Sequence, residues 1–245
     1  MKARQTIRTL ALASAAWSGL AALPALAQDA AQPPAAASEE DNGAIVVTAR
    51  RREETLVSVP IAVSAFSGAA LERSGAIDIS DLANVTPNTT LEASRGTNST
   101  LTAFIRGVGQ QDPVSGFEQG VGIYLDDVYL NRPQGALLDI YDVERIEVLR
   151  GPQGTLYGRN ATGGVINILT NKPQLGENSA SMTGEYGNYD MVRLKGFVNL
   201  SPSEEFGVRV AGFYLDRQGI MDNVYTGNEI DSRSLWSFRA SVKAQ

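Results

Sequence analysis

The stretch "VERIEVLRGPQGTLYGRNATGGVINILTNKP" (residues 143–173) contains two β-prone runs separated by a loop rich in glycine. Each run is short and ends at glycine or asparagine, which is typical of a strand. Five of the fourteen residues at 151–164 are glycine. Because glycine adopts positive φ angles and lets backbones approach closely, this composition predicts a set of tight turns between the two strands.

The same loop begins like a phosphate-binding P-loop, because four residues separate Gly158 from Gly163. A P-loop continues with a lysine and a serine or threonine, but Gly164 and Val165 occupy those positions. The run that follows is β-branched and short, so it resembles a strand rather than the helix that would bind the phosphate. We therefore expect turns here and no nucleotide site.

The region upstream of this stretch, from Pro60, has the pattern of one compact α+β domain. Residues 61–66 ("IAVSAF") are expected to form a strand, followed by a helix from Ser67 to about Gly75. A second short helix is expected after a cap at Asp78. Two further runs, "LTAFIRG" and "GVGIYLDDVYL", are each expected to form one strand.

Downstream of Pro173 the apolar residues alternate strictly with polar ones, with a period of two. The apolar members are Ala180, Met182, Gly184 and Tyr186, then Val192, Leu194, Gly196, Val198 and Leu200, then Phe206, Val208, Val210, Gly212 and Tyr214, and finally Trp236, Phe238, Ala240 and Val242. Strands of this kind predict a transmembrane β-barrel with an apolar outside, and aromatic residues near the strand ends would form interfacial girdles. The same alternation also fits half of a soluble sandwich, so this alternative stays open.

The connections between these four strands differ in length. Short turns lie at Gly187-Asn188 and at "SPSEE" (201–205), whereas residues 216–233 form a long connection. Outer-membrane barrels have short periplasmic turns and longer outside loops, so we place 216–233 outside. Four strands cannot close a barrel, and we expect this chain to be a truncated product that does not transport alone.

The N-terminus resembles an export signal. Three basic residues precede an apolar stretch that ends in "ALAQ" at 25–28, so residues 1–27 are predicted to be a signal peptide that is removed. Residues 28–43 are rich in alanine, proline and acids, and we expect a disordered tether. No later stretch is long and apolar enough to form a membrane helix.

Composition excludes several classes of function. The chain contains no cysteine and no histidine, which excludes disulfides, thiol nucleophiles, imidazole bases and His-ligated metals. It is acidic overall, so nucleic acid is not expected as a partner. We expect no enzyme, no catalytic residues, no metal and no cofactor. A periplasmic hydrolase that uses Asp126, Asp127 or Glu147 is a weaker alternative, because adjacent acids more often end a strand.

The segment "AIVVTARRREE" (44–54) joins a short β-prone patch to a run of charges. Two interpretations remain open from the residues alone. The patch is either the first strand of the following domain or a strand that adds itself to the sheet edge of a partner protein.

The order of these segments resembles the TonB-dependent outer-membrane receptors. The resemblance rests on "IVVTA" (45–49) as a TonB box, and on "VSVPIAVSAFSGAAL", "YLDDVYLNRP" and the stretch at 143–173 as plug sequence. It implies an α+β plug domain at 55–173, followed at 174–245 by the first antiparallel strands of a 22-stranded barrel in the outer membrane. It also implies active uptake of a scarce nutrient, most often a ferric siderophore, with energy relayed by the partner TonB.

The resemblance further assigns roles to single residues. Ile45, Val46, Val47, Thr48 and Ala49 would bind TonB as a strand, with residues 44–54 as the TonB-box segment. Arg106 and Arg150 match plug arginines that pair with barrel glutamates, and such glutamates would lie beyond Gln245. Candidate ligand-loop residues on the plug are Thr97, Asn98, Ser99, Thr100, Gln110, Gln111 and Asp112. Alternatives are uptake of a carbohydrate or another non-iron ligand, and a secreted binding or adhesion module.

Overall fold

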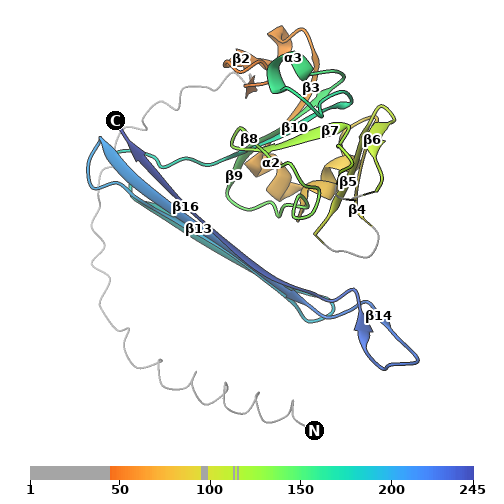
Figure 1. The fold of residues 1–245 in the computed structure, drawn as a ribbon. Helices are drawn as coiled ribbons and strands as arrows, with labels where there is room; N and C mark the ends of the chain where they lie inside the picture. The colour runs from red at the N-terminus through yellow and green to blue at the C-terminus, as the bar shows by residue number, and fades with distance from the viewer. Residues whose placement is uncertain (1–44, 95–98, 113, 115) are drawn as a thin grey trace, which may run out of the picture. The chain divides into compact units, whose positions relative to one another are not determined.

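The computed structural model describes residues 45–94, 99–112, 114 and 116–245 (Figure 1). The expected signal peptide at 1–27, the expected tether at 28–43, and the ligand-loop candidates Thr97 and Asn98 lie outside these residues. Among the helices of the described residues, none is long and apolar enough to cross a membrane.

A mixed five-stranded sheet forms the centre of the α+β domain. Its strands follow the order β3-β9-β10-β7-β8, and all neighbours are antiparallel except β10 and β7, which are parallel. The two runs of residues 143–173 are its adjacent strands β9 and β10, as expected. The bounds are β3 (Ala62–Ser67), β7 (Val121–Leu125), β8 (Val128–Tyr129), β9 (Val143–Arg150) and β10 (Gly164–Thr170).

Two short helical segments cover this sheet. Helix α2 (Gly68–Arg73) begins after Ser67, as expected, and the Ser67 side chain caps it by accepting a hydrogen bond from the Ala70 backbone N–H. The second segment, η3 (Ile79–Asn84), is a 3-10 helix rather than an α-helix, and Asp78 caps it in a capping box. Both segments contribute buried residues to the main core, which includes Leu71, Ile79, Leu82, Ile146 and Ile166.

A second, three-stranded sheet and the glycine-rich loop complete the α+β domain. The sheet consists of β4 (Thr89–Ala93), β5 (Leu101–Ile105) and β6 (Val108–Gln110). The loop makes the expected turns, with φ of 105° at Gly151 and 80° at Gly158. It also contains a single helical turn, α3 (Gly154–Tyr157), which the sequence did not predict.

The two adjacent acids in "YLDDVYL" form a hairpin turn. Asp126 and Asp127 have φ of 47° and 65°, as a two-residue type I′ turn requires, so the single expected strand is divided into β7 and β8. The Asp126 carboxylate accepts hydrogen bonds from the backbone N–H of Thr170 (3.0 Å) and its hydroxyl (2.7 Å), and pairs with Lys172 (2.6 Å). Burial raises the Asp126 pKa, but the bonds from Lys172 and Thr170 outweigh it and the net shift is downward. Asp126 is therefore a structural residue of the turn.

The four alternating strands form one antiparallel sheet, here called the wall. Its order is β11-β12-β13-β16, with short turns between the first three strands. The long connection after β13 contains a small hairpin of its own, β14 (Met221–Asp222) with β15 (Glu229–Ile230). The wall strands are β11 (Ser179–Gly187), β12 (Met191–Leu200), β13 (Phe206–Arg217) and β16 (Arg233–Ala244).

The two faces of the wall have inverted polarity compared with a soluble sandwich. Its apolar face is exposed, with Met182 78% accessible, Trp236 72% and Phe238 69%. The opposite face buries charged residues such as Arg209, which is 5% accessible. A sandwich would bury the apolar side chains, whereas a barrel wall exposes them to lipid. The structure therefore favours the barrel alternative.

An acid pair beside η3 gives the fold a pH dependence. The backbone of Asp139 forms an isolated β-bridge with that of Asp78. The Asp78 carboxylate forms an ion pair with Arg233 of the wall (3.1 Å). Burial is the main cause that raises the Asp139 pKa from 3.8 to about 6, and repulsion from the Asp78 charge adds to it. Attraction to Arg233 lowers this pKa and offsets part of the rise. The folded state thus prefers protonated Asp139. Its contribution to stability is present at low pH and is lost as pH rises from about 4 to above 6.

The variant Asp139→Asn tests this dependence. At pH 7.5 it should raise the free energy of unfolding by about 1–2 kcal/mol, because it removes the buried charge, and the gain should vanish near pH 4. Denaturant unfolding of the purified protein at both pH values measures the difference. Exposed Asp112→Asn is the control. A gain that is equal at both pH values would contradict the assignment to Asp139.

Candidate functional site

The segment Ile45–Ala49 folds back on its own chain. Strand β1 (Val46–Val47) pairs antiparallel with β2 (Glu54–Thr55), which leads into the 3-10 turn η2 (Leu56–Ser58). The Ile45 carbonyl also accepts a hydrogen bond from the Leu56 backbone N–H (2.8 Å). In this state the segment is therefore the first strand of the folded region, which was one of the two interpretations of the sequence.

Two of the five residues of this segment are buried in the α+β domain. Val47 and Ala49 are fully inaccessible, in a cluster with Leu149 and Val165 of the central sheet, whereas Ile45 and Val46 are not enclosed. A partner that pairs with the whole segment must therefore first draw it away from the domain.

Glu147 of β9 holds the centre of the segment. Its Oε1 accepts hydrogen bonds from the Thr48 backbone N–H (2.7 Å), the Thr48 hydroxyl (3.2 Å) and the Arg145 Nε (2.9 Å). The Arg145 guanidinium also donates to the Thr48 hydroxyl (3.3 Å). The Glu147 side chain is fully buried, so these charge-assisted bonds are shielded from water.

Tyr157 of α3 holds the end of the segment. Its hydroxyl donates to the Ala49 carbonyl (3.2 Å), and the Arg51 guanidinium lies over its ring, 4.6 Å from the centroid. Burial, and then the nearby charge of Glu147, raise the Tyr157 pKa to about 12. The hydroxyl therefore remains a donor throughout the physiological pH range. The one-turn helix in the glycine-rich loop is thus the element that positions this hydroxyl.

Glu147→Gln should loosen the segment. The change removes a buried charge that accepts three hydrogen bonds, at a cost of about 1.5–3 kcal/mol, so the released state should become about tenfold or more populated. The chain has no native cysteine, so a single Ala49→Cys reports release through its rate of thiol labelling. The matched control is Glu144→Gln, which removes an exposed partner of Arg145. Equal labelling rates in Ala49→Cys with and without the added Glu147→Gln change would refute the holding role.

The structure brings Arg106 and Arg150 to the same turn. The Arg106 backbone N–H donates to the Asn88 carbonyl (2.8 Å), and the Arg150 guanidinium donates to the neighbouring Pro87 carbonyl (3.5 Å). Arg150 is the last residue of β9, and Arg106 directly follows β5 with φ of 53°. Within the described part of the chain, neither arginine forms an ion pair. Their seating role stays a prediction.

The ligand-loop candidates that the structure describes are not equivalent. Ser99, Gln111 and Asp112 are exposed, and Gln110 is half-buried at the end of β6. Thr100 is fully buried, and its carbonyl accepts a hydrogen bond from the Ser94 N–H (2.8 Å). Thr100 therefore cannot reach a ligand from outside in this state, and a ligand role for the exposed residues stays a prediction.

Sequence reasoning missed Glu147, Arg145 and Tyr157 as residues that hold the segment. One signal was available, because Glu147 interrupts the apolar residues of "IEVL" within a predicted strand, and a charged residue is seldom buried without a partner. Its partner could not be identified, since Thr48 lies 99 positions earlier in the chain. Among the described residues, no three acidic side chains gather as a metal site would require.

Comparison with known proteins identifies the α+β domain. The TonB-dependent receptor plug domain family matches residues 55–165. The pesticin receptor of Yersinia pestis is 32% identical over 188 residues, which cover 74% of this chain and 26% of the relative. An iron-regulated outer membrane virulence protein of Vibrio cholerae is 34% identical over 134 residues, covering 49% of this chain and 19% of the relative.

A solved structure agrees with the fold. The ferric yersiniabactin uptake receptor FyuA from Yersinia pestis matches with a TM-score of 0.66 and 26% identity, over 74% of this chain and 28% of that receptor. The chain thus spans about a quarter of the length of the proteins that it matches. These proteins are receptors rather than enzymes. The chain belongs to the TonB-dependent receptors, and it carries their plug domain followed by antiparallel wall strands.

Proposed function

We propose that this chain is the plug and the first wall strands of an outer-membrane receptor that takes up a ferric siderophore with energy supplied by TonB. The observation that carries the proposal is the arrangement of the wall, whose charged face turns toward the plug domain while its apolar face is exposed. That polarity suits a plug inside a lipid-embedded barrel. Export by the signal peptide at 1–27 would deliver the chain to this membrane.

TonB is proposed to bind Ile45–Ala49 by strand addition. The exposed Ile45 and Val46 offer a starting point, and the remaining residues become available once Thr48 and Ala49 leave Glu147 and Tyr157. Arg106 and Arg150 are proposed to seat the plug, each through a barrel carboxylate. Neither forms an ion pair in the described residues, where Arg106 is exposed and Arg150 half-buried. A guanidinium that a complete barrel enclosed would need a counter-ion.

The names of two matched proteins support iron as the cargo, since one is iron-regulated and the other takes up ferric yersiniabactin. The proposed ligand class is therefore a ferric siderophore, held by exposed plug loops such as those of Ser99 and Gln111 together with barrel loops.

The test is uptake by cells that express a receptor carrying this region with a complete barrel. We expect ⁵⁵Fe to enter from at least one probe among ferric yersiniabactin, a ferric catecholate and a ferric hydroxamate, and to stop entering when TonB is deleted. The same strain is grown on defined oligosaccharides as the comparison. Growth that depends on the receptor only with an oligosaccharide would replace the iron proposal with carbohydrate uptake.

A further inference from the structure

One corner of the plug carries a carboxylate that faces two arginines of the wall. Asp142 directly precedes β9, with φ of 50° and a side chain that is 5% exposed. Arg209 of β13 donates to it from Nε (3.0 Å to Oδ2) and from Nη2 (2.5 Å to Oδ1). Arg239 of β16 donates from Nη2 to the Asp142 carbonyl (2.8 Å) and to Oδ2 (3.2 Å). Asn171 donates to Oδ1 (2.9 Å), so the carboxylate is fully used.

Aromatic rings enclose these charges. The Arg209 guanidinium lies over the Phe197 ring at 3.7 Å, and the Arg239 guanidinium lies 5.1 Å from the Tyr141 centroid. Tyr141 stacks on Phe213 (5.6 Å), and its hydroxyl is 2.7 Å from the Ser237 Oγ. The corner Tyr141–Asp142 thus contacts β13 and β16, and Arg209 connects it to the Phe197 ring of β12. Both the ionic and the stacking contacts gain strength from exclusion of water.

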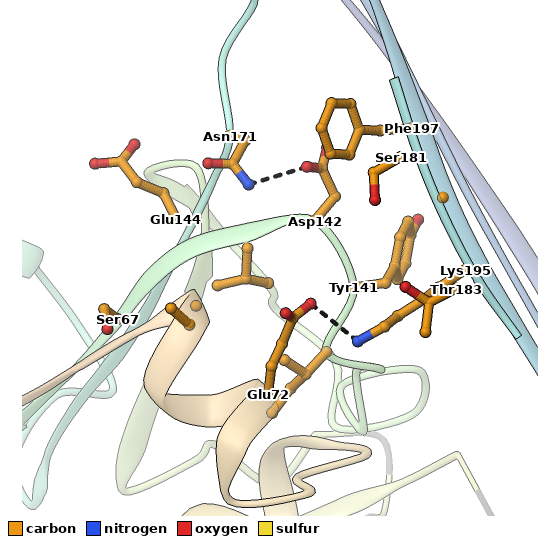
Figure 2. Close-up of a pocket in the computed structure, with 15 residues that line it drawn as sticks. Ser67, Glu72, Tyr141, Asp142, Glu144, Asn171, Ser181, Thr183, Lys195 and Phe197 are labelled. Carbon is orange, nitrogen blue, oxygen red and sulfur yellow. Dashed lines mark hydrogen bonds and ion pairs between the residues drawn. The ribbon is translucent and has the colours of Figure 1, made fainter. Parts of the chain in front are cut away.

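The plug is held far more weakly beside this corner. A cavity of about 400 Å³ lies between the plug and strands β11 and β12. Figure 2 shows Glu72 of the plug facing Lys195 and Thr183 of the wall across it. One ion pair spans it, between Glu72 of α2 and Lys195 of β12 (2.9 Å). The Glu72 side chain is 59% exposed and the Lys195 side chain 17%, and a single ion pair with one exposed partner contributes little to stability.

The buried contact of Asp142 and the ion pair of Glu72 with Lys195 lie on different elements of the plug. Asp142 anchors the start of β9, and Glu147 of the same strand holds the N-terminal segment. Force applied to that segment therefore reaches β9 close to its anchor on the wall. Helix α2, by contrast, reaches the wall through Glu72.

We propose that Asp142 is a positioning residue that keeps β9 seated on wall arginines Arg209 and Arg239, and that the plug first parts from the wall at the cavity spanned by Glu72 and Lys195. The inference rests on the proposed function, because it assigns steps of the same import process. We call the contact of Asp142 with Arg209 and Arg239 the seat. In the seat the acid lies on the plug and the arginines on the wall, whereas Arg106 and Arg150 are plug arginines proposed to pair with barrel acids.

Passive leak tests the seat without any import. In cells that express a receptor carrying this region with a complete barrel, Asp142→Asn should speed entry of vancomycin by about fivefold or more, because two buried arginines lose their counter-ion. Glu72→Gln, at equal receptor level, should change the leak by less than about twofold. Adding Arg209→Met to Asp142→Asn should lower the leak again, which a general loss of folding would not do. An unchanged leak in Asp142→Asn, or no rescue in the double variant, would overturn the seat.

A reversible crosslink tests the cavity. Cysteines that replace Glu72 and Lys195 are bridged by a disulfide-containing bifunctional maleimide, and uptake of the ferric probe is compared before bridging, after bridging and after reduction. Bridging should reduce uptake about tenfold while probe binding persists, and reduction should restore it. Full uptake in the bridged receptor would contradict the proposal that the plug first separates from the wall at this cavity. Absence of uptake even before bridging would instead count against the proposed function, while the leak assay still decides the seat.

Discussion

Val47→Pro is expected to abolish energised uptake of the ferric probe while leaving probe binding at the cell surface intact. Proline removes a backbone N–H and fixes φ, so the segment can no longer add itself as a regular strand to TonB. Uptake of ⁵⁵Fe should fall to the level of a strain without TonB. The measurement pairs this uptake with binding of the same probe to cells at 0 °C.

Val47→Ala is the matched control for the proline variant. Val47 is fully buried, so both substitutions disturb its packing against the plug, but alanine keeps the backbone donor. Uptake should therefore survive in Val47→Ala. Normal uptake in Val47→Pro would reject the assignment of 45–49 to TonB, whereas equal loss in both variants would point to the packing of Val47 rather than to strand pairing.

Gly164→Ala should produce the largest loss of stability in the plug. Gly164 has φ of 155°, lies between β7 and β9 in the central sheet, and would place a Cβ against the Leu149 carbonyl and the Ile105 side chain. The unfavourable backbone angle and the steric overlap together should cost about 3 kcal/mol or more. Hydrogen exchange of the β10 amides should then become about a hundredfold faster.

Gly154→Ala is the control within the same glycine-rich loop. Gly154 begins α3, and a Cβ placed there meets nothing within 4 Å. Alanine also favours the helical conformation, so this variant should leave exchange unchanged or slightly slower. If both variants behaved alike, the glycines of the loop would serve only general flexibility, and the strict requirement at Gly164 would be wrong.

The regular elements of this chain could be predicted from sequence because their signals are local. The period of two in the wall strands and the β-branched runs of β9 and β10 depend only on neighbouring residues. The helical turn α3 was missed because four residues in a glycine-rich loop carry no helical period. The Asp126-Asp127 hairpin was missed although two adjacent aspartates are compatible with the positive φ angles of such a turn.

The site could be predicted only in outline because its contacts join distant parts of the chain. The sequence suggested that 45–49 acts as a strand, but not that Glu147 and Tyr157 hold it. Arg209 and Arg239 occupy polar positions of the alternating wall strands, but their partner Asp142 lies 67 and 97 positions away in the chain. A single sequence gives the identity of such groups and not which of them meet.

Energised uptake requires TonB to reach the N-terminal segment, and a site-specific disulfide tests this contact directly. Because the chain has no native cysteine, Val46→Cys gives a single thiol at the exposed edge of the segment, to be oxidised with cysteines along the strand that TonB would pair with it. The matched control, Val224→Cys, is 89% exposed in the long connection expected to lie outside the membrane. We expect a TonB adduct at position 46, increased by the ferric probe, and none at position 224. No adduct at 46 in a receptor present at normal levels, or equal adducts at both positions, would contradict this contact.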